Sequence, residues 1–504
     1  MLEIIRRYDV TAGENTDNPF LLGAFAPNRV EYTADTASLR VIGEIPRDLH
    51  GIFVRNTHNQ VHTPMGVYHP FDGDGMLHAV HFENGQATYR NRFIRTTGFL
   101  AEQAAGKSLW PGLLQPDLGS YRGWGAMGAM KDNAGTDVIG HAGRLLASMS
   151  QGSEPWRLDP ITLETLGPDA NWARQVPDGV SAHYKVDPVT GEMMFFNYPE
   201  RWPYMHYGVV NRNNELVHYV PIELPGARWP HDLGITQNYT ILHDLPLFFD
   251  PDGLKSGKHR LVFNRDLPAR FGIIPRHGDN TQVRWFEATP CYVLHLTNCY
   301  EVGDEVVMDG CIMPDYHPVP VNAAGNVYDR IKANLDKHRN KTHMHRWRFN
   351  LRTGKTTEQY LDDEVTEFPI CSNDYVGRPY RYSYNVLYQP GEWLFSGVKR
   401  FDLDTGATAR HEYGPGRFGS EPQMARRVGA VHEDDGYLIS MVADMNADTS
   451  EIVILDAANI DREPLARILL PERMSIGTHA CWVEGDRIHG EHRPPSSVIS
   501  STGS

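Results

Sequence analysis

A short turn motif recurs between runs of strand-forming residues, and it constrains the fold more than any other feature of the sequence. Asp187, Asn350 and Asp402 each begin a segment of the form Asp/Asn-x-x-Thr-Gly, and a variant carries Leu163 in the glycine position. In such a hairpin the Asp or Asn side chain caps the turn, and the glycine takes the positive φ that closes it. Repeated strand–turn–strand units favour a β-propeller, although any large antiparallel β protein also contains hairpins of this kind.

Long helical patterns are rare in the chain. We expect helices over 97–114, where a proline interrupts the pattern, and over 327–338. Most other segments are short alternating or β-branched runs, which 46 glycines and 34 prolines break up. Because no Pro/Ser-rich linker divides the sequence, we predict an all-β single domain over 1–504, with an N-terminal extension at 1–26 and a flexible tail at 492–504.

Composition excludes several classes of protein. A hydrophobic fraction of 40% and a charged fraction of 22% are typical of a globular chain rather than a disordered one. The net charge of −15 argues against a non-specific nucleic-acid binder. No apolar run reaches the length of about 18 residues that a spanning helix needs, and the first residues do not resemble a secretory signal. Five cysteines without a CxxC pair indicate a reducing compartment, and we therefore expect a cytoplasmic protein.

Four of the 24 histidines stand at the ends of strand-like segments beside small or polar residues. They are His183, His231, His295 and His479. Their spacing is too wide for a zinc finger or a helical HExxH site, so they converge only if each lies on a different blade and faces a common axis. Four neutral imidazoles suit iron, copper, nickel or zinc. Spacing alone favours the other interpretation, in which each is a buried core histidine.

Nine segments of the chain resemble the carotenoid cleavage oxygenase family, which includes apocarotenoid oxygenases, lignostilbene dioxygenases and the retinoid isomerase. The similarity extends from about residue 27 to about residue 491. The segments are 51–60, 71–85, 181–198, 231–242, 284–311, 367–384, 420–425, 433–442 and 477–483. Taken together they are a specific signature, whereas one of them alone would not be.

The resemblance implies a seven-bladed β-propeller with a helical and loop cap over a non-haem Fe(II) on the propeller axis. Its motifs identify the four histidines named above as the iron ligands. They also identify Glu367 and Glu421 as carboxylates that accept the second ring N–H of a ligand, which fixes the imidazole tautomer. Gln151 stands where the family commonly has a third glutamate. We expect its uncharged side-chain oxygen to accept a hydrogen bond from Nδ1–H of His231.

The family chemistry implies that dioxygen and an apolar alkene are the substrates. Cleavage of the C=C bond then yields two carbonyl products, and no nicotinamide or flavin motif is present. We expect an apocarotenoid-like polyene as the substrate. The alternatives are a stilbene or another phenylpropanoid alkene, a retinoid-type isomerohydrolase reaction, and a carotenoid-binding propeller without activity.

Three positions along the expected substrate tunnel bear on the choice of substrate. Lignostilbene dioxygenases carry a Tyr and a Lys that contact the phenolic hydroxyl, and Leu113 and Ser150 stand at the matching places here. Phe71, before the Asp-Gly-Asp motif, is retained. Loss of both polar contacts favours a polyene over a hydroxystilbene.

The apolar stretch 99–114 allows two interpretations. As a hydrophobic mouth it would place the protein at the periphery of a membrane or micelle, from which it would draw substrate. As an ordinary packed helix it would have no such role. We expect a monomer.

Overall fold

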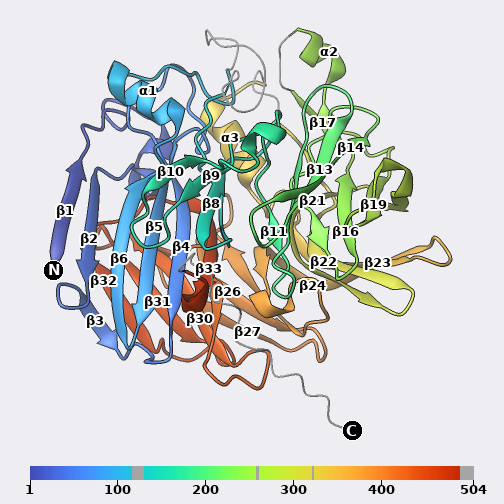
Figure 1. Ribbon diagram of the computed structural model, residues 1–504. Helices are drawn as coiled ribbons and strands as arrows, with labels where there is room; N and C mark the ends of the chain where they lie inside the picture. Colours follow the sequence, from blue (N-terminus) through green and yellow to red (C-terminus); the bar gives the residue numbers. More distant parts are fainter. Residues whose placement is uncertain (116–129, 257–259, 320–322, 489–504) are drawn as a thin grey trace.

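The computed structural model describes residues 1–115, 130–256, 260–319 and 323–488, and the expected tail at 492–504 lies outside them. Figure 1 shows antiparallel sheets arranged in a ring, with helices at one end. The α-helices of the described residues are α1 (Thr97–Ala105), α2 (Pro251–Lys255) and α3 (Val327–Leu335).

Residues 2–288, joined by one strand from the C-terminal end of the chain, build four sheets with antiparallel strands. In spatial order, the first sheet contains β1 (Leu2–Arg7), β2 (Val30–Asp35), β6 (Gln86–Phe93), β5 (Asp74–Glu83), β4 (Gly51–Asn59) and β33 (Gly477–Glu484). The second contains β10 (Thr165–Pro168), β9 (Trp156–Leu158), β8 (Arg144–Ser148) and β7 (Asp137–His141). The third contains β11 (Lys185–Val186), β12 (Met193–Asn197), β13 (Tyr204–Val210) and β14 (Leu216–Glu223), and the fourth contains β15 (Gly234–Ile235), β16 (Tyr239–Asp244), β19 (Ala269–Pro275) and β20 (Arg284–Ala288).

The second half builds the remaining blades. One continuous sheet contains β21 (Tyr292–Val302), β22 (Glu305–Met313), β23 (His343–Asn350), β24 (Thr356–Ile370), β25 (Tyr382–Tyr388), β26 (Phe395–Asp402) and β27 (Thr408–Glu412). The last sheet contains β28 (Arg417–Phe418), β30 (Gly436–Asp444), β31 (Thr449–Asp456), β32 (Ala466–Leu470) and β3 (Arg40–Gly43), with β29 (Gln423–Arg426) also on β30. A two-stranded ribbon, β17 (Leu247–Phe249) with β18 (Leu261–Phe263), stands apart.

The long strand β24 explains why seven blades appear as six large sheets in the described residues. The first part of β24 pairs with β23 and its last part pairs with β25, so this single strand belongs to two neighbouring blades. The ring is closed twice by strands from opposite ends of the chain, because β33 pairs with β4 and β3 pairs with β32. The seven-bladed β-propeller expected from the sequence is confirmed.

The recurring turn motif forms the hairpins that it predicts. Gly191, Gly354 and Gly406 have φ values of 72°, 74° and 75°, and the Asp187 carboxylate accepts hydrogen bonds from the backbone of its own turn. Leu163 adopts a φ of 61° in the glycine position of the variant, a conformation that favours glycine. The motif therefore forms the turns that end one strand and begin the next on several blades.

The expected helix over 97–114 is shorter than its sequence pattern. It ends at Ala105 because Gly106 takes a φ of 66° and caps the helix through the Glu102 carbonyl. The N-terminal extension at 1–26 places β1 at the outer edge of the first sheet. None of the helices in the described ranges combines the length and apolar character needed to cross a bilayer.

Apolar side chains fill the spaces between neighbouring blades. Phe53 and Trp482 of the first sheet, for example, pack in one cluster with Ile439 and Ile454 of the last sheet. Each side chain of this size contributes about 1.5–3 kcal/mol when fully buried. Packing of this kind holds the two ends of the chain together and fixes the inner strands that carry the candidate site.

Candidate metal centre

The four histidines selected from the sequence come together in the structure. One nitrogen from each of His183, His231, His295 and His479 lies within 4.8 Å of the others. His295 lies in β21 and His479 in β33, while His183 and His231 precede β11 and β15. Four different blades therefore supply one imidazole each. Three of the residues are only 4–6% exposed, so the group is shielded from bulk water.

Backbone contacts position two of these histidines. His183 has a φ of 72°, and its N–H donates a 2.9 Å hydrogen bond to Asp137 Oδ2 on β7. A left-handed conformation at a non-glycine residue is costly and is retained where the surroundings fix it. Asp232, next to His231, accepts hydrogen bonds from the backbone N–H groups of Leu233 and Leu296. Asp232 therefore ties the His231 loop to the strand that carries His295.

Carboxylates orient the other two histidines. His295 Nδ1 lies 2.5 Å from Glu367 Oε2, and His479 Nδ1 lies 3.3 Å from Glu421 Oε1. Glu367 also accepts from the N–H of Phe368, and Glu421 accepts from the N–H of Ala480. When Nδ1–H donates to a carboxylate, the Nε2 lone pair is left for a metal. The two glutamates thus occupy the positions expected from their motifs.

Gln151 does not make the hydrogen bond that we expected. Its side-chain nitrogen and His231 Nδ1 are both buried without a hydrogen-bond partner in the described part of the chain. The expectation assumed an extended strand through this segment, in which side chains alternate between two faces. In the structure β8 ends at Ser148, and Gln151 adopts a φ of 77°, so the alternation does not apply.

The electrostatics favour the neutral imidazole at three of the four histidines. Burial lowers the pKa of His183, His231 and His295 well below the usual value, and the neighbouring imidazoles lower it further. Burial is the largest influence on His479 and acts to lower its pKa, but the charge and hydrogen bond of Glu421, together with the charges of Asp137 and Asp232, raise the pKa above its ordinary value. Neutral imidazole is the form that binds metals.

The arrangement of the imidazole nitrogens shows whether a metal ion fits among them. His295 Nε2 is buried with no hydrogen-bond partner among the described residues, and His183 Nε2 lies 2.9 Å from His231 Nε2. Buried nitrogen lone pairs that face one another are satisfied by a cation placed among them. The four-histidine group therefore fits a metal ion, and imidazole donors suit iron, copper, nickel or zinc.

Aromatic side chains form a wall beside the histidines. The ring of Phe368 lies 4.5 Å from that of His295 and 4.9 Å from that of His479. Trp393 lies 5.7 Å from Phe368 and 5.4 Å from Phe71. Phe71, expected in the substrate tunnel, is thus linked to the histidine group by continuous aromatic contacts. Sequence reasoning missed Phe368 and Trp393, although Phe368 directly follows Glu367 in the EFP motif.

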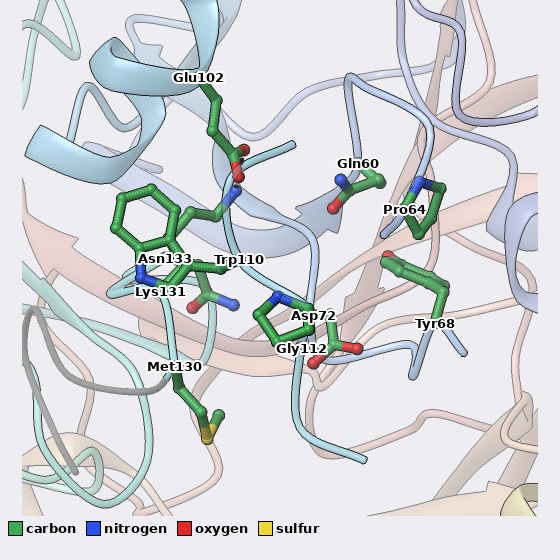
Figure 2. A pocket seen from close by; sticks show the side chains of 11 residues that line it. Gln60, Pro64, Tyr68, Asp72, Glu102, Trp110, Gly112, Met130, Lys131 and Asn133 are labelled. Atoms are coloured by element: carbon green, nitrogen blue, oxygen red, sulfur yellow. Dashed lines mark hydrogen bonds and ion pairs between the residues drawn. The ribbon is translucent and has the colours of Figure 1, made fainter. Parts of the chain in front are cut away.

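A second feature is a small cavity under α1, whose lining residues are shown in Figure 2. Lys131 lies at its edge and pairs with Glu102 at 2.7 Å and with Asp74 at 2.8 Å. Asp72 lines the same cavity and accepts a 2.7 Å hydrogen bond from the N–H of Leu113. Leu113 and Phe71 are therefore chain neighbours of cavity-lining residues.

Ser150 is half-buried and is not among the residues that line this cavity. Its N–H donates to Thr136 Oγ1 at 3.2 Å. Within 99–114, Phe99 and Trp110 are buried and Leu100 is 50% exposed. Two of the apolar side chains of this stretch therefore face inward, and membrane contact through it stays a prediction.

Comparisons with known proteins place the chain in a family. Residues 25–484 match the family model described as retinal pigment epithelial membrane protein. The chain is 32% identical to the carotenoid 9,10(9',10')-cleavage dioxygenase of Crocus sativus, over 93% of this chain and 90% of that protein. It is 31% identical to the isoeugenol monooxygenase of Pseudomonas nitroreducens, over 93% of this chain and 98% of that protein. The crystal structure of Pseudomonas brassicacearum lignostilbene dioxygenase superposes with a TM-score of 0.80 and 28% identity, over 93% of this chain and 99% of that one. The chain therefore belongs to the carotenoid cleavage oxygenase family.

Proposed function

We propose that the protein is an iron(II) dioxygenase that cleaves a C=C bond of an apocarotenoid-like polyene and places one oxygen atom on each of two carbonyl products. The observation that carries this proposal is the convergence of four largely buried imidazoles, within 4.8 Å of one another, from four blades. The carotenoid-cleaving relative, which is 32% identical over 93% of this chain, supports the choice of a polyene.

Iron(II) bound by these histidines would supply the reaction of dioxygen with the two alkene carbons. The chain provides the rest of the site. Glu367 and Glu421 hold two of the imidazoles in the orientation that leaves Nε2 toward the centre. Burial of the group excludes water from the reacting atoms.

The aromatic wall gives the site its preference for conjugated substrates. The rings of Phe71, Phe368 and Trp393 offer flat apolar surfaces on which an extended π-system can lie. Contacts of this kind align one double bond with the metal and keep a dry surface around it. They suit a polyene and an aryl alkene equally, so they do not by themselves choose between the two.

A second candidate substrate is a stilbene or another phenylpropanoid alkene. It is favoured by the isoeugenol monooxygenase relative, which this chain matches at 31% identity over 98% of that protein. Leu113 and Ser150 stand where lignostilbene dioxygenases have the Tyr and Lys that contact the phenol, and the loss of those two contacts argues for the polyene.

The experiment is product analysis by mass spectrometry after iron-loaded protein has been offered apocarotenals, carotenes, stilbenes and isoeugenol. We expect two carbonyl fragments from at least one apocarotenal, with the highest kcat/KM of the panel. Faster turnover of a stilbene or of isoeugenol would transfer the assignment to phenylpropanoids. A product isomerised but not cleaved would indicate the isomerohydrolase reaction instead.

A further inference from the structure

Lys337 is a buried cation that has no carboxylate within ion-pair distance among the described residues, although the charge of Glu367 acts on it from farther away. It stands two residues after the end of α3, beyond the capping residue Asp336, and is only 4% exposed. Its ammonium makes no hydrogen bond or ion pair with any residue in the described ranges. The contact that the structure gives it is the ring of Trp393, whose centroid lies 5.4 Å from Nζ.

The other buried lysines are neutralised. Among the described residues, Lys131, Lys337 and Lys399 are the lysines with less than a tenth of their surface exposed. Lys131 pairs with Asp74 and Glu102, and Lys399 pairs with Asp362 and Glu364. A buried charge is stable when it is paired, and removing its partner is strongly destabilising. Lys337 departs from this rule, and such departures concentrate at functional sites.

Lys337 also lies at the candidate site rather than in a remote part of the core. Trp393, on which its ammonium rests, contacts Phe71 and Phe368, and Phe368 contacts two of the four histidines. The ammonium is close enough to His231 and His295 to lower the pKa of each. Burial lowers the pKa of Lys337 itself, and the Glu367 carboxylate opposes that change. These relations place the ammonium at the aromatic wall beside the centre.

We propose that Lys337 and Trp393 form a subsite that binds an electronegative oxygen conjugated with the alkene of the substrate. The ammonium donates hydrogen bonds to a carbonyl or hydroxyl oxygen, and the aromatic wall holds the attached π-system. This inference rests on the proposed function and adds the substrate class: an alkene that carries an oxygen function rather than a plain hydrocarbon. An apocarotenal aldehyde and a phenol both supply that oxygen, and the experiment distinguishes them.

The subsite also changes how Leu113 and Ser150 are interpreted. The loss of the Tyr and Lys contacts at these two places favoured a polyene over a hydroxystilbene when only the sequence was considered. The buried ammonium of Lys337, at another place on the aromatic wall, would provide a strong hydrogen-bond donor in place of those contacts. Hydrogen bonds to charged groups contribute about 1.5–3 kcal/mol, which corresponds to roughly 10–100-fold in affinity.

The test compares Lys337→Met with wild type in two matched pairs of probes. One pair is a long apocarotenal and β-carotene, and the other is hydroxystilbene and stilbene. Anaerobic binding is measured by quenching of tryptophan fluorescence, and KM and kcat are measured separately under air. We expect Lys337→Met to weaken binding of the oxygenated member of one pair by roughly 10–100-fold and to raise its KM, with the hydrocarbon member unchanged. The pair that shows the effect identifies aldehyde or phenol as the source of the oxygen.

Two further variants separate recognition from structure. Lys332→Met removes a lysine of α3 that is 32% exposed and paired with Glu392, and it should leave both pairs unchanged. Lys337→Arg keeps the charge and should recover part of the selectivity. Metal content should be the same in all three variants as in wild type.

Three results would overturn the subsite. One is a wild-type protein that binds both members of each pair equally, and another is an equal loss for both members in Lys337→Met. The third is loss of metal from Lys337→Met, which would show that the ammonium acts through Glu367 on His295. Because binding is measured without turnover, the subsite is tested even if no probe is cleaved, and absence of cleavage bears on the proposed function alone.

Discussion

The two halves of the four-histidine group are oriented by different means. His295 and His479 each direct Nδ1 toward a buried glutamate, at 2.5 Å and 3.3 Å. His183 is fixed through its backbone N–H, and His231 Nδ1 has no hydrogen-bond partner in the described ranges. A carboxylate raises the basicity of the imidazole that it contacts, whereas a backbone contact fixes position only. The comparison indicates that the metal affinity of the centre depends more on the carboxylates beside His295 and His479 than on the contacts of His183 and His231.

The largest effect is expected from removing a carboxylate-supported imidazole. His295→Ala deletes one of four donors and leaves Glu367 buried without its partner, so we expect near-complete loss of bound metal. Metal per protein, measured by inductively coupled plasma mass spectrometry, checks this. His277→Ala is the control, since His277 is an exposed histidine outside the group, and it should retain full metal. Full metal content in His295→Ala would remove the basis of the proposed centre.

Removing the shorter carboxylate contact should have the next largest effect. Glu367→Leu abolishes the acceptor for His295 Nδ1, and losses of this kind weaken metal binding by roughly 10–100-fold. Competition with a chelator of known affinity measures the change. Glu367→Gln keeps an acceptor oxygen and should recover part of the affinity. If Glu367→Leu bound metal as tightly as wild type, the contact would be structural only.

Glu421 should matter less than Glu367. Its contact with His479 is 3.3 Å rather than 2.5 Å, and a longer hydrogen bond couples the carboxylate less strongly to the imidazole. The same chelator competition on Glu421→Leu should therefore show a smaller loss of affinity. A greater loss than in Glu367→Leu would reverse the ranking that the two distances support.

The smallest effect on metal affinity is expected at Gln151, beside the pair of histidines, His183 and His231, that have no carboxylate contact at Nδ1 among the residues that the structure describes. Because its side chain makes no hydrogen bond to His231, Gln151→Leu should change metal affinity less than either glutamate variant. The hydrogen bond expected from the sequence would instead give a loss of roughly 10–100-fold, as for a lost carboxylate. If Gln151→Leu lost as much metal affinity as Glu367→Leu, Gln151 would accept the hydrogen bond from His231 that the motif implies. Both halves of the four-histidine group would then have side-chain acceptors.

The features that could be predicted from the sequence are those with a local chemical cause or a distinctive motif. The turns at Asp187, Asn350 and Asp402 require a capping side chain and a positive-φ glycine, and the structure has both at Asp187. The start of α1 at Thr97 was predicted, whereas its end at Ala105, before Gly106, was placed too late. Convergence of the four histidines could not be derived from spacing, since it depends on how seven blades close into a ring. It was reached through the family resemblance.

The residues that sequence reasoning misjudged or did not single out depend on conformation or on distant neighbours. Gln151 was placed by the family motif, with strand alternation in support, but it adopts a left-handed conformation beyond the end of β8 and makes no hydrogen bond to His231. Lys337 stands in the charged stretch 336–341, which is typical of an exposed loop, and only the fold buries it against Trp393. Lys131 likewise gives no local sign that two carboxylates, from β5 and α1, will surround it. Long-range packing decides all of these positions.

Anomalous diffraction at the iron absorption edge, from crystals of the iron-loaded protein, tests the central claim most directly. The account predicts one strong peak among the nitrogens of His183, His231, His295 and His479, which already lie within 4.8 Å of one another. A matched data set collected below the edge should lose that peak. A peak at any other position, or its absence from the four nitrogens in protein shown to contain stoichiometric iron, would contradict the account.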